Sequence, residues 1–74
     1  MSSESLRIKV NGDVRLVKPG TTLDGLVREL ALTPERLAIE RNRVVVRRAD
    51  WPDTLLCEGD AIEIVHFVGG GILM

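Results

Sequence analysis

The sequence predicts a small α+β domain in which a mixed sheet of about five strands wraps one main helix. Segments typical of strands and helices follow one another in the order two strands, one helix, two strands and a final strand. The predicted helix has a single apolar stripe, so it packs across one face of a sheet. The 74 residues, of which 45% are hydrophobic and 28% charged, are enough for one domain only.

The first two strands are predicted to form a hairpin. Leu6–Val10 and Val14–Val17 alternate between apolar and charged side chains, which is typical of half-buried strands. Asn11–Asp13 lies between them and is a turn signal. A two-residue loop would put Ile8 opposite a charged residue, whereas one more loop residue puts it opposite Leu16 and buries a common apolar face. We therefore expect a three-residue loop or a bulge.

The main helix follows a break at Pro19–Gly20. Thr21 or Thr22 is expected to cap its N-terminus. The apolar stripe has the spacing i, i+3, i+4 and i+7 and consists of Leu23, Leu26, Val27 and Leu30. Gly25 inside this helix costs about 1 kcal/mol relative to alanine.

The second half of the chain completes the sheet. Thr33 and Pro34 are typical of a cap and the first position of a short helical turn. Residues 47–56 are expected to be irregular, with Trp51 covering the edge of the core. Strands are expected at Leu37–Arg41, Val44–Val46 and Ala61–Val68, with turns at residues 42–43 and 58–60. A sheet of this order around one helix is the β-grasp (ubiquitin-like) arrangement.

Composition excludes several function classes. A chain this short has little scaffold for a deep catalytic cleft, so we expect no enzyme acting alone. The single cysteine, Cys57, cannot form an internal disulfide, and no Cys and His residues have the spacing of a zinc site. No stretch is long enough to span a membrane, and the first residues do not resemble an export signal. The pI near 5.7 and the scarcity of aromatic residues argue against nucleic-acid binding. We expect a cytoplasmic protein with no membrane or nucleic-acid partner.

The glycines Gly69–Gly71 directly follow the last predicted strand. Residues 1–5 are expected to be disordered, residues 6–68 to form the domain, and residues 69–74 to form a flexible tail of three glycines and three further residues. A tail without Cβ atoms can enter a narrow channel of another enzyme and present a carboxylate there. A flexible end without function is the alternative interpretation.

Several segments resemble the thiamine-pathway sulfur carrier family, ThiS. The most specific is Glu58–Gly71, which contains a Glu-Gly-Asp turn, an apolar strand and glycines at the family's spacing. Val10–Gly12, Pro19–Leu23 and Arg48–Trp51 also resemble the family. The resemblance covers residues 6–71 and implies the β-grasp fold.

The resemblance also implies a mechanism and partners. An E1-like, ThiF-type enzyme would adenylate the carboxylate of Gly71, and sulfur would then replace AMP to leave a thiocarboxylate. Gly69 and Gly70 would thread into the partner. A ThiG-type thiazole synthase would receive the sulfur for the thiazole ring of thiamine. The chain would be a co-substrate without a bound cofactor, and the partner enzyme would use ATP and a sulfur donor.

The chain departs from the family pattern after Gly71, because the family ends at its glycines and residues 72–74 follow here. A trimming protease is one explanation, residues added to the natural chain are a second, and a chain that carries no sulfur is a third. The molybdopterin and cysteine pathways use similar carriers, so the receiving pathway stays open. An interaction module that never carries sulfur is the alternative from a different class.

The last strand has apolar residues on both faces. If Ile62 and Ile64 face the helix, Val65 and Phe67 lie exposed on the other face, just before the tail. With Val68, they are the predicted docking residues for a partner. Burial against a neighbouring loop is the alternative.

Other polar residues are interpreted structurally. His66 is expected to be a partly covered structural histidine, because the sequence places no catalytic group beside it. Cys57 is expected to be a small apolar residue beside a turn, and a sulfur-relay role is the weaker alternative. Four arginines are expected to form a solvated basic patch, with docking of an acidic partner as the second interpretation; they are Arg41, Arg43, Arg47 and Arg48.

Overall fold

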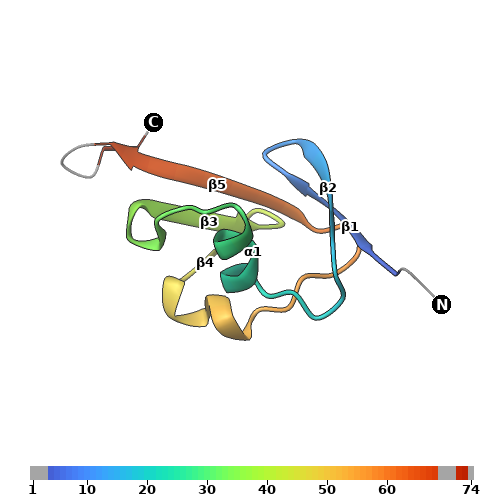
Figure 1. The fold of residues 1–74 in the computed structure, drawn as a ribbon. Coiled ribbons are helices and arrows are strands. Elements are labelled where there is room, and N and C mark those ends of the chain that lie inside the picture. The colour runs from blue at the N-terminus through green and yellow to red at the C-terminus, as the bar shows by residue number, and fades with distance from the viewer. Residues whose placement is uncertain (1–3, 69–71, 74) are drawn as a thin grey trace.

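The computed structural model describes residues 4–68 and 72–73, and these form one sheet with one main helix. The strands are β1 (Leu6–Val10), β2 (Asp13–Val17), β3 (Leu37–Arg41), β4 (Val44–Val46), β5 (Ala61–Val68) and β6 (Ile72–Leu73). The helix is α1 (Leu23–Glu29), and two short 3₁₀ helices are η1 (Pro34–Arg36) and η2 (Arg48–Asp53). The strand order is β2-β1-β5-β3-β4, with β6 pairing separately with β5 (Figure 1). This confirms the predicted β-grasp arrangement and the predicted bounds of β3, β4 and β5.

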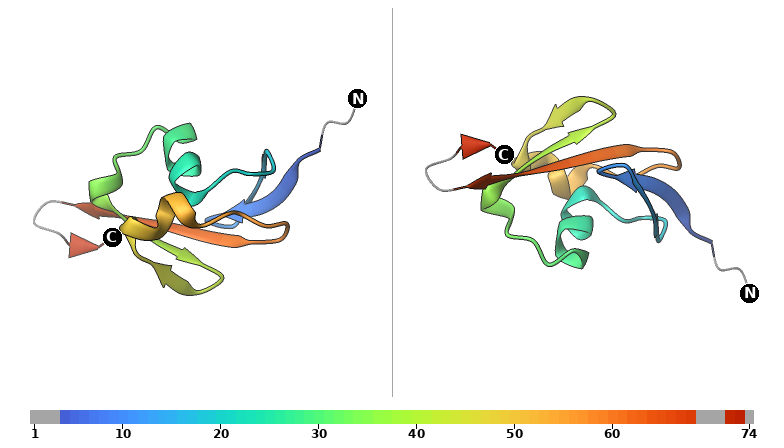
Figure 2. Two further views of the ribbon diagram at one scale, coloured as in Figure 1. Left: turned by 90° about the horizontal axis from the view of Figure 1, so that it is seen from below. Right: turned by 90° about the horizontal axis from the view of Figure 1, so that it is seen from above.

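The strand β5 lies at the centre of the sheet, between β1 and β3 (Figure 1). It runs parallel to β1 and antiparallel to β3, so the sheet is mixed as predicted. The helix α1 lies on one face of this sheet, and the start of β1 and the end of β5 lie at opposite ends of the molecule (Figure 2). β1 pairs with Ala61 and Ile62, and β3 pairs with Ile62 through His66, so the first six residues of β5 each have a paired neighbour on at least one side.

The helix α1 begins at Thr22, as expected from the cap signal. The Thr22 hydroxyl accepts a hydrogen bond from the amide of Gly25 at 3.0 Å, which satisfies one of the free donors at the helix start. Leu23, Leu26 and Val27 are buried, so the predicted stripe faces the core. The helix ends where Ala31 turns into the left-handed region with a φ of 57°.

The first hairpin differs from the prediction. Its loop has two residues, Asn11 and Gly12, and Ile8 pairs with Arg15 instead of Leu16. Asn11 and Gly12 have φ values of 52° and 89°, which suit the turn whose twist matches that of the flanking strands. Leu16 consequently lies on the outer face of the sheet with 60% of its surface exposed.

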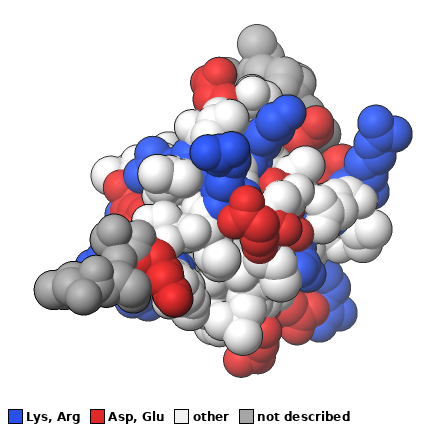
Figure 3. Space-filling model, turned by 90° about the vertical axis from the view of Figure 1, so that its right-hand side faces the viewer, with Lys and Arg blue, Asp and Glu red and all other residues white. Residues whose placement is uncertain are grey.

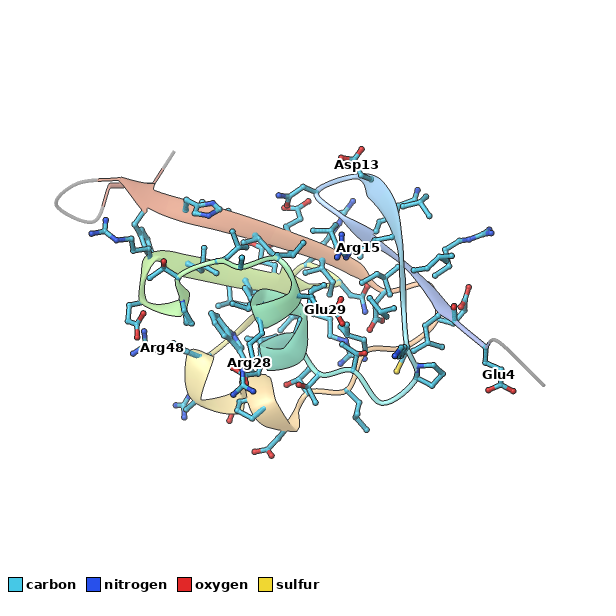
Figure 4. The ribbon with its side chains drawn as sticks, viewed as in Figure 1. Glu4, Asp13, Arg15, Arg28, Glu29 and Arg48 are labelled. Atoms are coloured by element: carbon cyan, nitrogen blue, oxygen red, sulfur yellow. The ribbon has the colours of Figure 1, made fainter. Side chains whose placement is uncertain are left out.

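The polar face of β2 is accommodated by the helix. Arg15 points between the hairpin and α1, where its guanidinium lies 3.7 Å from the Glu29 carboxylate (Figure 4). The half-buried stem of Arg15 thus fills the position for which an apolar residue was expected. The expected three-residue loop was wrong, because the prediction assumed that only apolar side chains of β2 could cover the helix-facing side of the hairpin.

Trp51 is also placed differently from the prediction. It is 1% exposed and is among the largest fully buried side chains of the core, instead of covering the core's edge. Its indole Nε1 donates a hydrogen bond to the carbonyl oxygen of Val46 at 2.9 Å. The segment expected to be irregular contains η2, which contacts α1 and brings the indole inward.

Candidate functional site

The candidate site is the C-terminal end of β5, which leads to the three glycines. The register with β3 ends at the pair Leu37–His66, so Phe67 and Val68 extend beyond β3. They pair instead with β6, Phe67 with Leu73 and Val68 with Ile72. The strand thus projects past the body of the sheet at the end of the molecule opposite the start of β1 (Figure 1).

Most of the predicted tail lies outside the described residues. This applies to Gly69, Gly70 and Gly71, so their threading and the modification at Gly71 stay predictions. Ile72 and Leu73 form β6, and the flexibility of residues 69–74 stays a prediction. Residues 1–3 of the segment predicted to be disordered, residues 1–5, also lie outside the described residues.

The outer face of β5 carries the predicted docking residues. Val65 and Phe67 share this face, opposite the buried Ile62 and Ile64, as the parity argument predicted. Both are half-buried, which is less exposed than expected, because β3 flanks Val65 and β6 flanks Phe67. Val68 is placed as a backbone position only. Their docking role stays a prediction.

The same face carries two acidic residues that oppose each other. Glu40 of β3 pairs directly with Glu63 of β5. The next pair on the same face, two residues along each strand, is Ala38 with Val65. Like charges in a cross-strand pair are destabilising. The alternation of side chains along β5 predicts that Glu63 shares a face with Val65 and Phe67. It does not predict that Glu40 lies opposite Glu63, because that depends on the register between β3 and β5.

The N-terminal end of β5 is fixed by Asn11. The Asn11 side chain accepts a hydrogen bond from the amide of Ile64 at 2.8 Å and donates one to the carbonyl of Ile64 at 3.3 Å. Its own amide donates to the carbonyl of Ile62 at 2.8 Å. The side chain thereby continues the pairing of β1 with β5 past the last residue of β1.

A buried carboxylate fixes the turn before β5. Asp60 is 6% exposed and accepts hydrogen bonds from Arg41 Nε at 2.9 Å, Asn42 Nδ2 at 3.0 Å and the amide of Cys57 at 2.8 Å. Burial alone would raise the pKa of Asp60, but the hydrogen bonds from Asn42, Cys57 and Arg41 outweigh it and hold the pKa below its ordinary value. The pKa of Arg41 is raised in turn, chiefly by its hydrogen bond to Asp60.

The remaining predicted residues do not form a second site. His66 is exposed, not partly covered as expected, because it lies at the end of the register with β3. Cys57 lies beside the predicted turn but is exposed, with its Sγ 3.5 Å from Arg41 Nη2. Among the four arginines, Arg41 is half-buried against Asp60, whereas Arg43, Arg47 and Arg48 are exposed. Figure 4 labels Arg48 at the start of η2.

The described part of the chain shows no metal-binding cluster. Among residues 4–68 and 72–73, no three His, Cys, Asp or Glu side chains lie together in a way that could hold a metal ion. No helix in these ranges has the length and apolar character needed to cross a membrane.

Comparison with known proteins gives a consistent result. The chain is 37% identical over 65 residues to the sulfur carrier protein ThiS of Bacillus subtilis, which covers 86% of this chain and 98% of that protein. The crystal structure of the thiamine biosynthesis protein ThiS from Geobacter metallireducens has a TM-score of 0.75 and 29% identity, covering 89% of this chain and 100% of that one.

A second group of relatives is longer. The chain is 46% identical over 66 residues to a thiazole synthase of Magnetococcus marinus and 32% identical over 66 residues to one of Paramagnetospirillum magneticum. These matches cover 89% of this chain but only 20% of each thiazole synthase, so the chain spans about a fifth of their length.

The family model that matches this chain is that of the ThiS family, and it extends over residues 8–71. The match thus begins inside β1, runs through β5 and ends on the last of the three glycines. A match of that extent, together with a full-length relative and a shared fold, shows that this chain belongs to the ThiS family.

Proposed function

We propose that this chain is a sulfur carrier whose Gly71 carboxylate is adenylated and then converted to a thiocarboxylate. The observation that carries the proposal is the family match, which ends on Gly71, three residues after a central strand that projects from the sheet. A glycine tail on a rigid strand suits delivery of one carboxylate into a narrow site. The chain is then a co-substrate, and the catalytic groups belong to its partners.

The proposed chemistry has two steps. A Gly71 carboxylate oxygen attacks the α-phosphorus of ATP, pyrophosphate leaves, and an acyl-adenylate forms. Hydrosulfide, or a sulfur donor equivalent to it, then attacks the acyl carbon. The bond between this carbon and the AMP oxygen breaks, and AMP leaves with the electron pair. The product is a thiocarboxylate whose sulfur is a nucleophile for the next reaction. The first partner is therefore an adenylating enzyme of the ThiF type.

The second proposed partner is a thiazole synthase of the ThiG type. Two relatives named thiazole synthase contain a region similar to this chain within one longer polypeptide. Joining two modules in one chain raises the effective concentration of one at the other, which is useful when the two act together. We propose that this chain acts together with such a synthase and supplies sulfur for thiamine thiazole.

Docking is proposed on the outer face next to the tail. Val65 and Phe67 provide half-buried apolar surface there, and the opposed pair Glu40 and Glu63 adds negative charge. A partner face with apolar and basic side chains would cover Val65 and Phe67 and neutralise the charge of Glu40 and Glu63.

The residues after Gly71 require a processing step in this proposal. While Ile72 follows, the Gly71 carbonyl is part of a peptide bond and offers no carboxylate. A protease that cleaves after Gly71 would generate the carboxylate, and it would also remove β6 from Phe67 and Val68.

The test compares three forms of the chain with an adenylating enzyme, ATP and sulfide. The forms end at Met74, Gly71 and Gly70, and pyrophosphate release is measured at matched concentrations. The form ending at Gly71 should react and become heavier by the difference between a sulfur and an oxygen atom. The form ending at Gly70 is about 3.5 Å short, and misplacement by about 1 Å can cost about 100-fold in rate.

The controls separate the alternatives. The 74-residue form should be inert, and equal activity of this form would contradict the need for trimming. Silence of all three forms would favour a ubiquitin-like interaction module. Sulfur transfer from the thiocarboxylate form to a thiazole synthase, measured against molybdopterin and cysteine synthesis enzymes, identifies the receiving pathway.

A further inference from the structure

The edge of the sheet at β2 offers unpaired backbone groups. Among the described strands, β2 pairs only with β1, so its other edge faces away from the sheet. In an antiparallel pair, residues alternate between those that bond to the neighbour and those that turn their backbone groups outward. The residues of β2 that bond to β1 include Asp13, which closes the turn with Val10, and Arg15, which pairs with Ile8. The residues between and beyond them, Val14 and Leu16, therefore turn their N–H and C=O groups outward.

The side chains of the same two residues are exposed. Val14 is 59% and Leu16 is 60% exposed, and both lie on the outer face of the hairpin. Natural sheets protect long edge strands with prolines, charges or bulges, because an open apolar edge pairs with other strands. Between Asp13 and Val17 there is no proline or bulge, and the single basic residue, Arg15, points inward toward Glu29.

Two hollows lie beside the hairpin, and the first of them borders this edge. The hollow of about 280 Å³ lies on the helix side and is lined by apolar Val10 and Leu30 together with Arg15. The hollow of about 270 Å³ lies over β1 and the turn before β5, and it is lined by the basic Arg7 and Lys9 and by the acidic Glu58 and Asp60 among others. Val14 lines both hollows. An added strand projects its side chains alternately to the two faces, so those on the helix side would approach the first hollow.

The charges on the outer face indicate the chemistry of such a strand. Arg7 pairs with Leu16 and Lys9 pairs with Val14, so both charged residues on the outer face of the hairpin are basic. Neither forms an ion pair with any other residue in ranges 4–68 and 72–73. Across the whole end of the molecule, charges of both signs are interspersed with uncharged residues (Figure 3), so the preference comes from this local pair.

We propose that the β2 edge binds an extended segment of a partner protein by strand addition. The segment carries acidic side chains on the face that meets Arg7 and Lys9 and apolar side chains on the face that meets Leu30. The hairpin lies at the end of the molecule away from the projecting end of β5 (Figures 1 and 2). A partner bound here therefore leaves the tail free to enter an active site.

A second copy of the chain fits the edge less well. In a dimer, β2 would pair antiparallel with the β2 of the second copy, and the outward-turned residues would bond to each other. This pairing places Val14 opposite Leu16 and Arg15 opposite Arg15. Two like charges directly opposite each other oppose this register. Other registers that satisfy the outward groups shorten the paired segment.

The test uses a defined probe, an acetylated ten-residue peptide of alternating valine and glutamate, titrated into the 74-residue chain. A peptide with lysine in place of glutamate is the matched control. Backbone amide signals of Val14 and Leu16 should shift and become protected from exchange. The lysine peptide should bind about tenfold more weakly, and Lys9→Glu, which leaves one basic and one acidic residue on this face, should abolish this preference.

The Leu16→Pro variant tests the backbone contact. It removes an outward-facing N–H and no hydrogen bond to β1, so the sheet should stay folded while peptide binding is lost. Leu16→Thr keeps the N–H and should keep binding. If Leu16→Pro unfolds, the charge reversal at the exposed Lys9 decides the question.

Three outcomes would overturn the proposal: no binding of the acidic peptide, shifts confined to the C-terminal half of β5, or a concentration-dependent dimer that Leu16→Pro abolishes. Failure here is distinct from failure of the carrier function. Pyrophosphate release from the form ending at Gly71 does not require β2 and should be unchanged by Leu16→Pro.

Discussion

Asp60→Asn tests how the start of β5 is held. The Asp60 carboxylate accepts from Arg41 Nε, Asn42 Nδ2 and the Cys57 amide at 2.9, 3.0 and 2.8 Å. An asparagine keeps one acceptor oxygen and sets an amide donor against at least one of these donors. Asn42 cannot adapt by turning over, because its Oδ1 already accepts from the Ala61 amide at 2.9 Å.

The magnitude follows from these contacts. Hydrogen bonds to charged groups contribute about 1.5–3 kcal/mol, and an unpaired buried donor costs about 1–3 kcal/mol. The Arg41 side chain is 31% exposed, so water recovers part of its loss. We expect Asp60→Asn to lower the free energy of unfolding by about 2–3 kcal/mol, which lowers Tm by about 10–20 °C for a domain of this size.

The pH dependence gives a second check. The pKa of Asp60 is lowered on folding, so its charged form stabilises the protein above the ordinary value of 3.8, and this stabilisation is lost as the pH falls through the folded value. The stability difference between the natural chain and Asp60→Asn should stay constant from about pH 5 to 7 and shrink in more acidic solution.

The assay is thermal and urea unfolding of Asp60→Asn over this pH range. Asp53→Asn, at an exposed position of η2, is the control and should change stability by less than about 0.5 kcal/mol. A loss below about 0.5 kcal/mol for Asp60→Asn, or a difference that does not change with pH, would refute the assigned role of this carboxylate.

Three further substitutions test the helix and the docking face. Gly25→Ala should stabilise the chain by about 0.5–1 kcal/mol in thermal melts, because the new Cβ meets Thr22 Oγ1 at an ordinary 3.5 Å; a loss of stability would reveal strain at this position. Phe67→Asp should leave the fold intact and weaken binding to the adenylating enzyme more than about tenfold; unfolding would place Phe67 in the core instead. Glu63→Gln should raise stability by about 0.2–0.5 kcal/mol by relieving its opposition to Glu40, and it should weaken partner binding; unchanged binding would remove the acidic pair from the docking surface.

The sequence predicted those elements whose signal is local. The β3–β4 turn was recognisable from Asn42-Arg43, and both residues have the positive φ values of a tight two-residue loop. The eight residues of β5 were recognisable from their β-branched and apolar composition. In each case one segment contains all the information that its structure requires.

Predictions failed where a distant partner decides the outcome. The parity argument could not know that Glu29 would receive Arg15, so it chose the wrong hairpin register. Trp51 was predicted to cover the edge of the core, but η2 turns the ring into the core beside α1. The acidic pair on the outer face of β5 depends on the β3–β5 register, which no single segment encodes.

The parallel pairing of β1 with β5 has a mechanical consequence. Backbone bonds from Lys9 to Asp60, from Asn11 to Ile62 and from Gly59 to Arg7 join the two strands, at 2.9, 2.8 and 2.8 Å. Tension applied between the start of β1 and the end of β5 loads these bonds in shear, so they share the force and must break together. A pull on the chain beyond β5 is therefore resisted by several backbone bonds at once.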